Sequence, residues 1–207
     1  MNGCECSLAH VPRRIVLTGG PGAGKTAVLE LLRRTLCKHV HVLPESASIL
    51  FGGGFPRGDS PELRRAAQRA IFFIQRELET AMSEHDSAIA LCDRGTVDGL
   101  AYWPGPDDFF ASVGTTLDDE LARYHAVIHL RTPAVGYNHQ NPLRVESSAE
   151  AIAIDERIAA AWARHPRRFE VAPAADFLDK ARRAIEIVRS ELPPCCRRIP
   201  LAVSAPR

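Results

Sequence analysis

The sequence predicts a three-layer α/β fold in which helices cover both faces of a parallel sheet. Strand-like and helix-like segments alternate along the chain, and no internal repeat or low-complexity block interrupts them. The segment 88–91 is almost entirely apolar, as expected of a strand in the middle of a parallel sheet. A length of 207 residues suits one such domain. We expect this domain at residues 13–192, between tails at 1–12 and 193–207.

The elements of the first half are marked by their apolar pattern and by their ends. The apolar strand at 15–17 closes at a glycine-rich turn, and the helix at 25–37 repeats leucine and valine at helical spacing. The strand at 40–43 stops at Pro44. Residues 46–61 are rich in glycine and predict a mobile loop.

A long helix is expected at 61–84, because Ser60 can cap it and Pro61 favours the first helical turn. After the apolar strand at 88–91, the remaining segments are a strand at 126–130, an irregular polar stretch at 136–144, a helix at 148–163, a strand at 169–172 and a helix at 176–192. Prolines and arginines from Pro193 onward predict a loosely held end.

Composition and charge exclude several classes of partner. Hydrophobic residues make up 45% of the chain and charged residues 25%, the balance of a soluble protein with a buried core. A net charge of +1 predicts no general attraction to nucleic acid or to an anionic membrane. No apolar run approaches the ~20 residues that cross a bilayer, and residues 1–14 lack the apolar stretch of a secretory signal. We expect a cytoplasmic protein, with the oligomeric state, a homodimer included, left open.

The six cysteines fall into two groups. Cys37 and Cys92 lie within apolar patterns and are expected to be small core residues. Cys4-x-Cys6 and Cys195-Cys196 lie in the tails, and their spacings match neither of the common zinc patterns. Exposed reduced thiols are the expectation for the tails, and a metal or redox role is the alternative.

One motif predicts phosphate binding. Residues 19–26 satisfy G-x-x-x-x-G-K-[ST] at every fixed position, and they lie between an expected strand and an expected helix. Backbone N–H groups of such a loop converge on phosphate oxygens, Lys25 can reach the β- and γ-phosphates, and the Thr26 hydroxyl can ligate Mg²⁺. The residues expected to bind the nucleotide, ATP or GTP, are Gly19, Gly20, Pro21, Gly22, Ala23, Gly24, Lys25, Thr26 and Ala27.

Asp93 is the candidate for the acidic group that assists the metal. It follows the apolar strand at 88–91, so it should emerge near the phosphate loop at the carboxyl edge of the sheet, where open α/β sheets bind ligands. The alternative is a loop aspartate that caps the next helix. Arg94 beside it is expected to reach a substrate oxygen rather than to be a solvated surface arginine.

The run at residues 93–105, Asp-Arg-Gly-Thr-Val-Asp-Gly-Leu-Ala-Tyr-Trp-Pro-Gly, resembles the thymidylate kinases and deoxynucleoside kinases. Those enzymes carry a D-R-Y-x-D-S-x-x-A-Y-Q-G or an E-R-S run at this point. The wider pattern is similar to a family of bacterial AAA-type ATP-binding domains, which includes the ribosylnicotinamide kinase domain of the NAD-biosynthesis regulator. The resemblance covers residues 13–192. It implies a P-loop NTPase fold, with a kinase-like lid at about 136–147.

The resemblance also implies roles for single residues. Asp93 would assist Mg²⁺, Arg94 would contact the acceptor near the transferred phosphoryl group, and Tyr102 would line the acceptor pocket. Glu45 occupies the place where deoxynucleoside kinases keep a carboxylate that takes the proton of the acceptor hydroxyl; a helix-capping or surface glutamate is the alternative. Gly99 and Trp103 replace the serine and glutamine of thymidylate kinases, so thymine recognition is not implied.

The lid of such kinases brings arginines over the phosphates. Arg144 is the candidate because it is the one arginine within the polar loop itself, and Arg157 on the following helix is the second candidate. For both, an ordinary surface ion pair is the alternative. In the helix at 61–84, Gln68 and Gln75 lie one helical repeat apart, and we expect them on its solvated side rather than against a base.

These observations predict a small-molecule kinase that uses Mg-ATP, with Lys25, Glu45, Asp93, Arg94 and Arg144 as its catalytic residues and Thr26 and Asp93 as its metal ligands. The competing hypothesis is a nucleotide-dependent switch that hydrolyses slowly and acts through a protein partner, with the glycine-rich loop near Gly52 and the lid as the switching segments. The chain contains no N-K-x-D segment that would read guanine.

Overall fold

The computed structural model describes residues 10–197, apart from 38, 84–86, 107, 134–146 and 175. Five parallel strands form one sheet in the order β2-β3-β1-β4-β5. They are β1 (Arg13–Thr18), β2 (Val40–Leu43), β3 (Ile89–Asp93), β4 (Ala126–Leu130) and β5 (Arg168–Val171). The predicted α/β class with a parallel sheet is confirmed. The middle strands are buried on both faces, which explains their continuous apolar sequences.

The register brings functional residues to one edge. Leu17 pairs with Asp93 across β1 and β3, and Thr18 pairs with His129 across β1 and β4. Because all five strands are parallel, their carboxyl ends meet at this edge, and the loop after β1 leaves from the same place.

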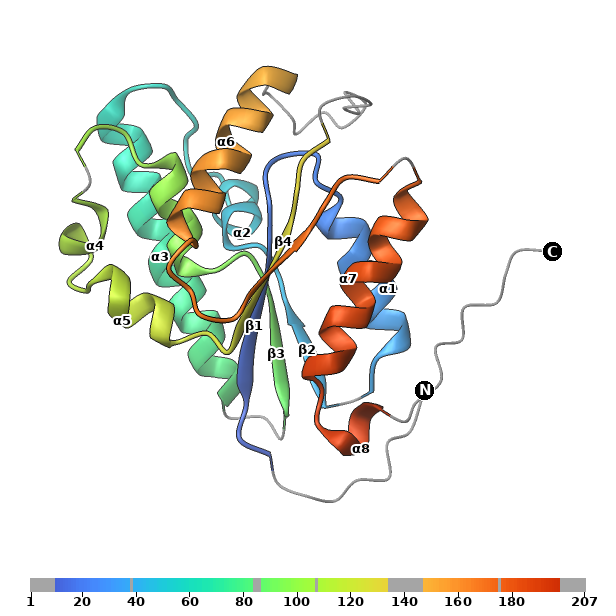
Figure 1. The fold of residues 1–207 in the computed structure, drawn as a ribbon. Coiled ribbons are helices and arrows are strands. Elements are labelled where there is room, and N and C mark those ends of the chain that lie inside the picture. Colours follow the sequence, from blue (N-terminus) through green and yellow to red (C-terminus); the bar gives the residue numbers. More distant parts are fainter. Residues whose placement is uncertain are drawn as a thin grey trace.

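Helices cover both faces of the sheet, as Figure 1 shows. One face carries α1 (Lys25–Thr35), α7 (Phe177–Glu191) and α8 (Pro194–Arg197). The other carries α2 (Ser46–Gly52), α3 (Pro61–Ser83), the 3₁₀ helix η1 (Thr96–Tyr102), α4 (Phe109–Ser112), α5 (Leu117–Ala122) and α6 (Ser148–Ala161). Side chains of successive strand residues point to opposite faces of the sheet. Ile15 and Leu17 therefore pack with α1 and α7, while Val16 packs with α6 and η1.

Two expectations about local structure were wrong. The glycine-rich segment does not begin as a loop, because Ser46–Gly52 forms helix α2 and glycines occupy only its end. The chain beyond Pro193 is not loose at first, because Pro194–Arg197 forms α8 and Cys196 on it is buried. In both cases tertiary packing outweighed the composition of the segment. The expected lid at 136–147 lies outside the described residues, except for Ser147, which caps α6. Among the described helices, none is both long and apolar enough to cross a membrane.

Candidate nucleotide and phosphoryl-acceptor site

The loop between β1 and α1 has a shape that only glycine permits at several positions. Gly22 and Gly24 have φ angles of 75° and 93°, in the left-handed region. A Cβ at Gly20 would stand 2.6 Å from the Thr132 hydroxyl oxygen and 2.8 Å from the Ala151 carbonyl oxygen. Backbone conformation at Gly22 and Gly24, and the lack of room for a Cβ at Gly20, therefore require glycine in this loop, as in loops whose backbone N–H groups bind phosphate.

Lys25 begins α1 and folds back over this loop. Its Nζ donates hydrogen bonds to the carbonyl oxygens of Gly19 at 2.8 Å and Gly20 at 3.1 Å, and the residue is 8% exposed. Burial and then the charge of Arg94 lower the pKa of Lys25 to about 8, although three nearby carboxylates raise it. A bound phosphate would oppose both effects, so the ammonium group is suited to an anionic ligand. Thr26, the next residue, is exposed.

Asp93, the last residue of β3, carries a carboxylate oxygen that fits a cation. Its Oδ1 is buried and has no hydrogen-bond partner among the described residues. Burial, with a contribution from Glu45, raises the pKa of Asp93 to about 6 in spite of Lys25 and Arg94. A buried carboxylate oxygen without a donor is costly, and a divalent cation with its waters would satisfy it. The Asp93 carboxylate and the Thr26 hydroxyl are oxygen donors of the kind that Mg²⁺ prefers, so these two residues could hold the ion.

Arg94 is held in a strained backbone conformation. Its φ of 72° is the one positive value among the described residues other than glycine, and its N–H donates to the Leu17 carbonyl oxygen at 3.1 Å. Its guanidinium group donates to Glu45 Oε1 at 2.8 Å and contacts Asp98 Oδ1 at 3.4 Å. It also lies 5.5 Å from the centre of the Tyr102 ring. Such strain is concentrated at functional sites, where the position of a side chain matters.

Glu45 comes from the end of β2 and meets Arg94 across the sheet edge. Burial alone would raise the pKa of Glu45, but Arg94, the hydroxyl of Ser48 and Lys25 outweigh it and hold the pKa at about 2. The Ser48 hydroxyl donates to Glu45 Oε2 at 2.6 Å. The structure thus brings Glu45 and the adjacent pair Asp93 and Arg94 together around Lys25, although these three parts of the chain are far apart in the sequence.

Two buried aspartates of this region had no role in the sequence analysis. Asp98 accepts hydrogen bonds from the Gly95 N–H at 3.0 Å, from Trp162 Nε1 at 3.1 Å and from the Thr18 hydroxyl. It therefore fixes the turn that carries Arg94 to the end of β1. Its place four residues after Arg94 in the kinase-like run was the one available signal.

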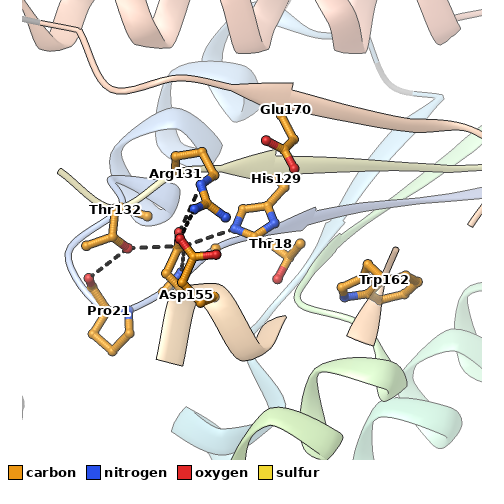
Figure 2. A network of polar contacts seen from close by, with 12 residues as sticks. Thr18, Pro21, His129, Arg131, Thr132, Asp155, Trp162 and Glu170 are labelled. Carbon is orange, nitrogen blue, oxygen red and sulfur yellow. Dashed lines mark hydrogen bonds and ion pairs between the residues drawn. The ribbon is translucent and has the colours of Figure 1, made fainter. Parts of the chain in front are cut away.

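Asp155 on α6 is the second, and Figure 2 shows the network around it. Its Oδ1 accepts from the Gly20 N–H at 2.8 Å, from His129 Nε2 at 2.9 Å and from the Thr132 hydroxyl at 3.3 Å, and Arg131 Nε lies 3.3 Å from Oδ2. Burial alone would raise the pKa of Asp155, but these partners hold it at about 2. The carboxylate thus ties the phosphate loop to α6 and to the end of β4. Nothing in the local sequence indicates this long-range contact.

Lys180 supports the loop from the α7 side. Its Nζ donates to the carbonyl oxygen of Ala23 at 2.8 Å and to that of Arg131 at 2.5 Å, and it is 4% exposed. The phosphate loop is therefore held between α6 and α7 before any ligand arrives.

The remaining candidates are not part of this cluster as described. Arg144 lies outside the described residues. Arg157 donates to the Ala101 carbonyl oxygen at 2.7 Å, so it braces η1. The expectation that Gln75 lies on a solvated face was wrong, because it is buried. It accepts a hydrogen bond from the Ser46 hydroxyl, which links α2 to α3, and donates one to Glu79 within α3.

Comparison with known proteins agrees with this geometry. A family model described as an AAA domain matches residues 14–180. The chain belongs to this AAA domain family. No curated protein matches the sequence of this AAA domain.

Solved structures show the same fold at low sequence identity. The structure of NadR protein in complex with NR has a TM-score of 0.67 and 16% identity, and covers 88% of this chain and 52% of that chain. Thymidylate kinase from Candida albicans has a TM-score of 0.60 and 13% identity, with 87% and 92% covered. Deoxyadenosine kinase from M. mycoides with bound dATP has a TM-score of 0.58 and 12% identity, and the match covers 85% of this chain and 98% of that chain. The AAA domain spans about half of the NadR chain, and it has the fold of P-loop nucleoside and nucleotide kinases.

Proposed function

We propose that this AAA domain transfers the terminal phosphoryl group of a magnesium-bound nucleoside triphosphate to a hydroxyl group of a nucleoside, a nucleotide or a related small metabolite. The observation that carries the proposal is the ion pair of Glu45 and Arg94 beside the phosphate loop. A module that only binds nucleotide needs the loop, but it does not need a carboxylate and a guanidinium group next to it. Two of the structural neighbours, a deoxyadenosine kinase and a thymidylate kinase, support the same class of acceptor.

The loop and Lys25 would bind the polyphosphate. The Lys25 ammonium group would exchange its two carbonyl partners for phosphate oxygens, and the loop N–H groups would orient the chain of phosphates. Thr26 and Asp93 would hold Mg²⁺, directly or through water, and the ion would neutralise charge on the β- and γ-phosphates.

Glu45 and Arg94 would serve the acceptor. The acceptor hydroxyl oxygen forms a bond to the γ-phosphorus while the bond from that phosphorus to the β–γ bridging oxygen breaks, and the nucleoside diphosphate leaves with the electron pair. The hydroxyl proton passes to Glu45. Arg94 strongly lowers the pKa of Glu45, so any movement of Arg94 toward the phosphoryl oxygens would make Glu45 a better proton acceptor. Positioning of this kind supplies most of the catalysis in phosphoryl transfer.

The test is release of nucleoside diphosphate by the purified chain with Mg-ATP or Mg-GTP and a panel of nucleosides, nucleotides and nicotinamide riboside. We expect turnover that depends on one acceptor class. Lys25→Ala should lower kcat at least ~100-fold, because a charge contact to the transition state is lost. Glu45→Gln should lower kcat with little change in nucleotide affinity. Arg33→Ala and Glu62→Gln, at exposed positions of α1 and α3, are the matched controls.

The competing switch hypothesis makes the opposite prediction for the same assay. Turnover would then be slow with every small acceptor and would rise only with a macromolecule. The contact of Ser46 on α2 with Gln75 on α3 supports the kinase proposal over this alternative for the segment near Gly52, because it holds α2 in place.

A further inference from the structure

A second group of chemically reactive side chains lies at the opposite end of the sheet from the phosphate loop. Cys37 and His39 are in the connection from α1 to β2, and Cys196 is on α8 (Figure 1). The three residues are 4%, 1% and 3% exposed. Their ligand atoms, two Sγ and one ring nitrogen, all lie within 4.8 Å of one another. Within the described part of the chain, no other such set of three was found.

The distances resemble those around a tetrahedral ion. With Zn–S bonds of about 2.3 Å and Zn–N bonds of about 2.0 Å, a tetrahedral zinc ion sets its sulfur and nitrogen ligands about 3.5 Å apart. The Nδ1 atom of His39 lies 3.6 Å from the Sγ of Cys196 and 4.0 Å from the Sγ of Cys37. Both nitrogen–sulfur distances are therefore within a few tenths of an ångström of those around a zinc ion, and the two sulfur atoms lie within 4.8 Å of each other.

Hydrogen bonding alone accounts poorly for this arrangement. A neutral imidazole nitrogen accepts through a single lone pair, yet two thiol groups converge on the same Nδ1. A metal ion between the three atoms would bond to each of them. The ring of His10 also lies edge-on against that of His39, with centroids 5.1 Å apart, so a further imidazole lies close to the cluster.

The cluster joins parts of the chain that lie far apart in the sequence. Cys196 lies 157 residues from His39, and α8 has only four residues, too few for a helix to be stable without tertiary contacts. Cys37 and Cys196 belong to a buried core cluster with apolar residues of α1, α7 and β3, so solvent is excluded from them, as at structural zinc sites. Two thiolates and an imidazole favour zinc over magnesium or calcium.

We propose that Cys37, His39 and Cys196 form a structural zinc site that fastens the C-terminal helix α8 to the start of β2. Binding would release the two thiol protons, and water or His10 would take the fourth position. The Cys-x-His spacing followed by a distant cysteine matches no common zinc pattern. This is why the sequence assigned Cys37 to the core and left Cys196 in the tail.

The experiment measures metal in the full-length chain, purified without chelator and reduced before analysis. We expect one zinc per chain by mass spectrometry of the metal, and a thiolate-to-cobalt charge-transfer band after exchange with Co²⁺. Cys196→Ser and Cys37→Ser should lose both signals, while Cys92→Ser, which changes a buried thiol on β3 outside the cluster, should keep both. Circular dichroism establishes whether each variant is folded.

Thermal unfolding provides a second readout, and its wild-type measurement does not depend on the stability of any variant. Added zinc should raise the melting temperature of the metal-stripped wild type and of Cys92→Ser, and leave that of Cys196→Ser unchanged. The proposal is overturned by wild-type protein that takes up neither zinc nor cobalt. Metal content that survives both cysteine substitutions, or a Cys37–Cys196 disulfide in protein purified without reductant, would also overturn it.

Discussion

The carboxylate of Asp155 provides the sharpest energetic test of how the phosphate loop is held. Asp155 is 2% exposed, and its partners lower its pKa from the ordinary 3.8 to about 2. This difference corresponds to roughly 2 kcal/mol of free energy of unfolding, because one unit of pKa is worth about 1.36 kcal/mol. Asn has the shape of the neutral acid, so Asp155→Asn should lose about this amount at pH 7. For a chain of this size the melting temperature would fall by roughly 5–10 °C.

The sign of the pH dependence follows from the direction of the pKa change. The folded-state pKa is the lower one, so the stabilisation is complete above about pH 4 and is lost as the pH falls toward 2. The gap between wild type and Asp155→Asn should therefore shrink to about half its full size at pH 3. Urea unfolding of both proteins at pH 7, 5 and 3 measures this difference in free energy of unfolding.

The matched control is Glu156→Gln at the neighbouring position. Glu156 also pairs with Arg131, but its side chain is 61% exposed, so its removal should change stability by at most ~1 kcal/mol. The reasoning is refuted if Asp155→Asn unfolds within ~0.5 kcal/mol of the wild type at pH 7. It is equally refuted if the gap does not narrow on acidification.

Three further predictions concern the candidate site. Burial raises the pKa of Asp93 to about 6, so its contribution destabilises the fold increasingly as the pH rises from 3.8 and fully above 6. Asp93→Asn should therefore raise the free energy of unfolding of the ligand-free protein at pH 7.5 by up to ~3 kcal/mol, and with it the melting temperature. The same variant should bind Mg-nucleotide more weakly in calorimetry. A variant that is less stable than the wild type at pH 7.5 would contradict this reasoning. Gly24→Ala should abolish nucleotide binding, because the new Cβ would lie 2.7 Å from the Phe177 ring. Gly54→Ala has nearly the same φ but open surroundings, so it should lower the free energy of unfolding only by the ~1–2 kcal/mol of backbone strain. Equal nucleotide affinity in the two variants would argue against the proposed loop. Asp98→Asn should lower kcat more than nucleotide affinity, since Asp98 positions Arg94 rather than the phosphate loop, and an unchanged kcat in the turnover assay would show that this contact is dispensable.

The sequence by itself determined the elements that have a strong local pattern. A few residues are enough to predict each of these elements: the continuous apolar strands, a helix start such as Ser60-Pro61, and the glycine motif at 19–26. It also located Asp93 and Arg94 correctly at the end of β3, since the carboxyl ends of parallel strands share an edge. The prediction of a loop at the start of the glycine-rich segment was wrong, because α2 is held by the buried Ser46–Gln75 contact rather than by helix propensity.

Only the tertiary structure decided which distant side chains meet. The bond from Asp155 to Gly20 spans 135 positions, the pair of Glu45 and Arg94 spans 49, and the contact of Cys196 with His39 spans 157. No local periodicity records such pairings, because a buried aspartate, glutamate or cysteine is indistinguishable in sequence from an exposed one. Their partners are selected by the sheet order and by the packing of helices on each face, which depend on the whole chain folding at once.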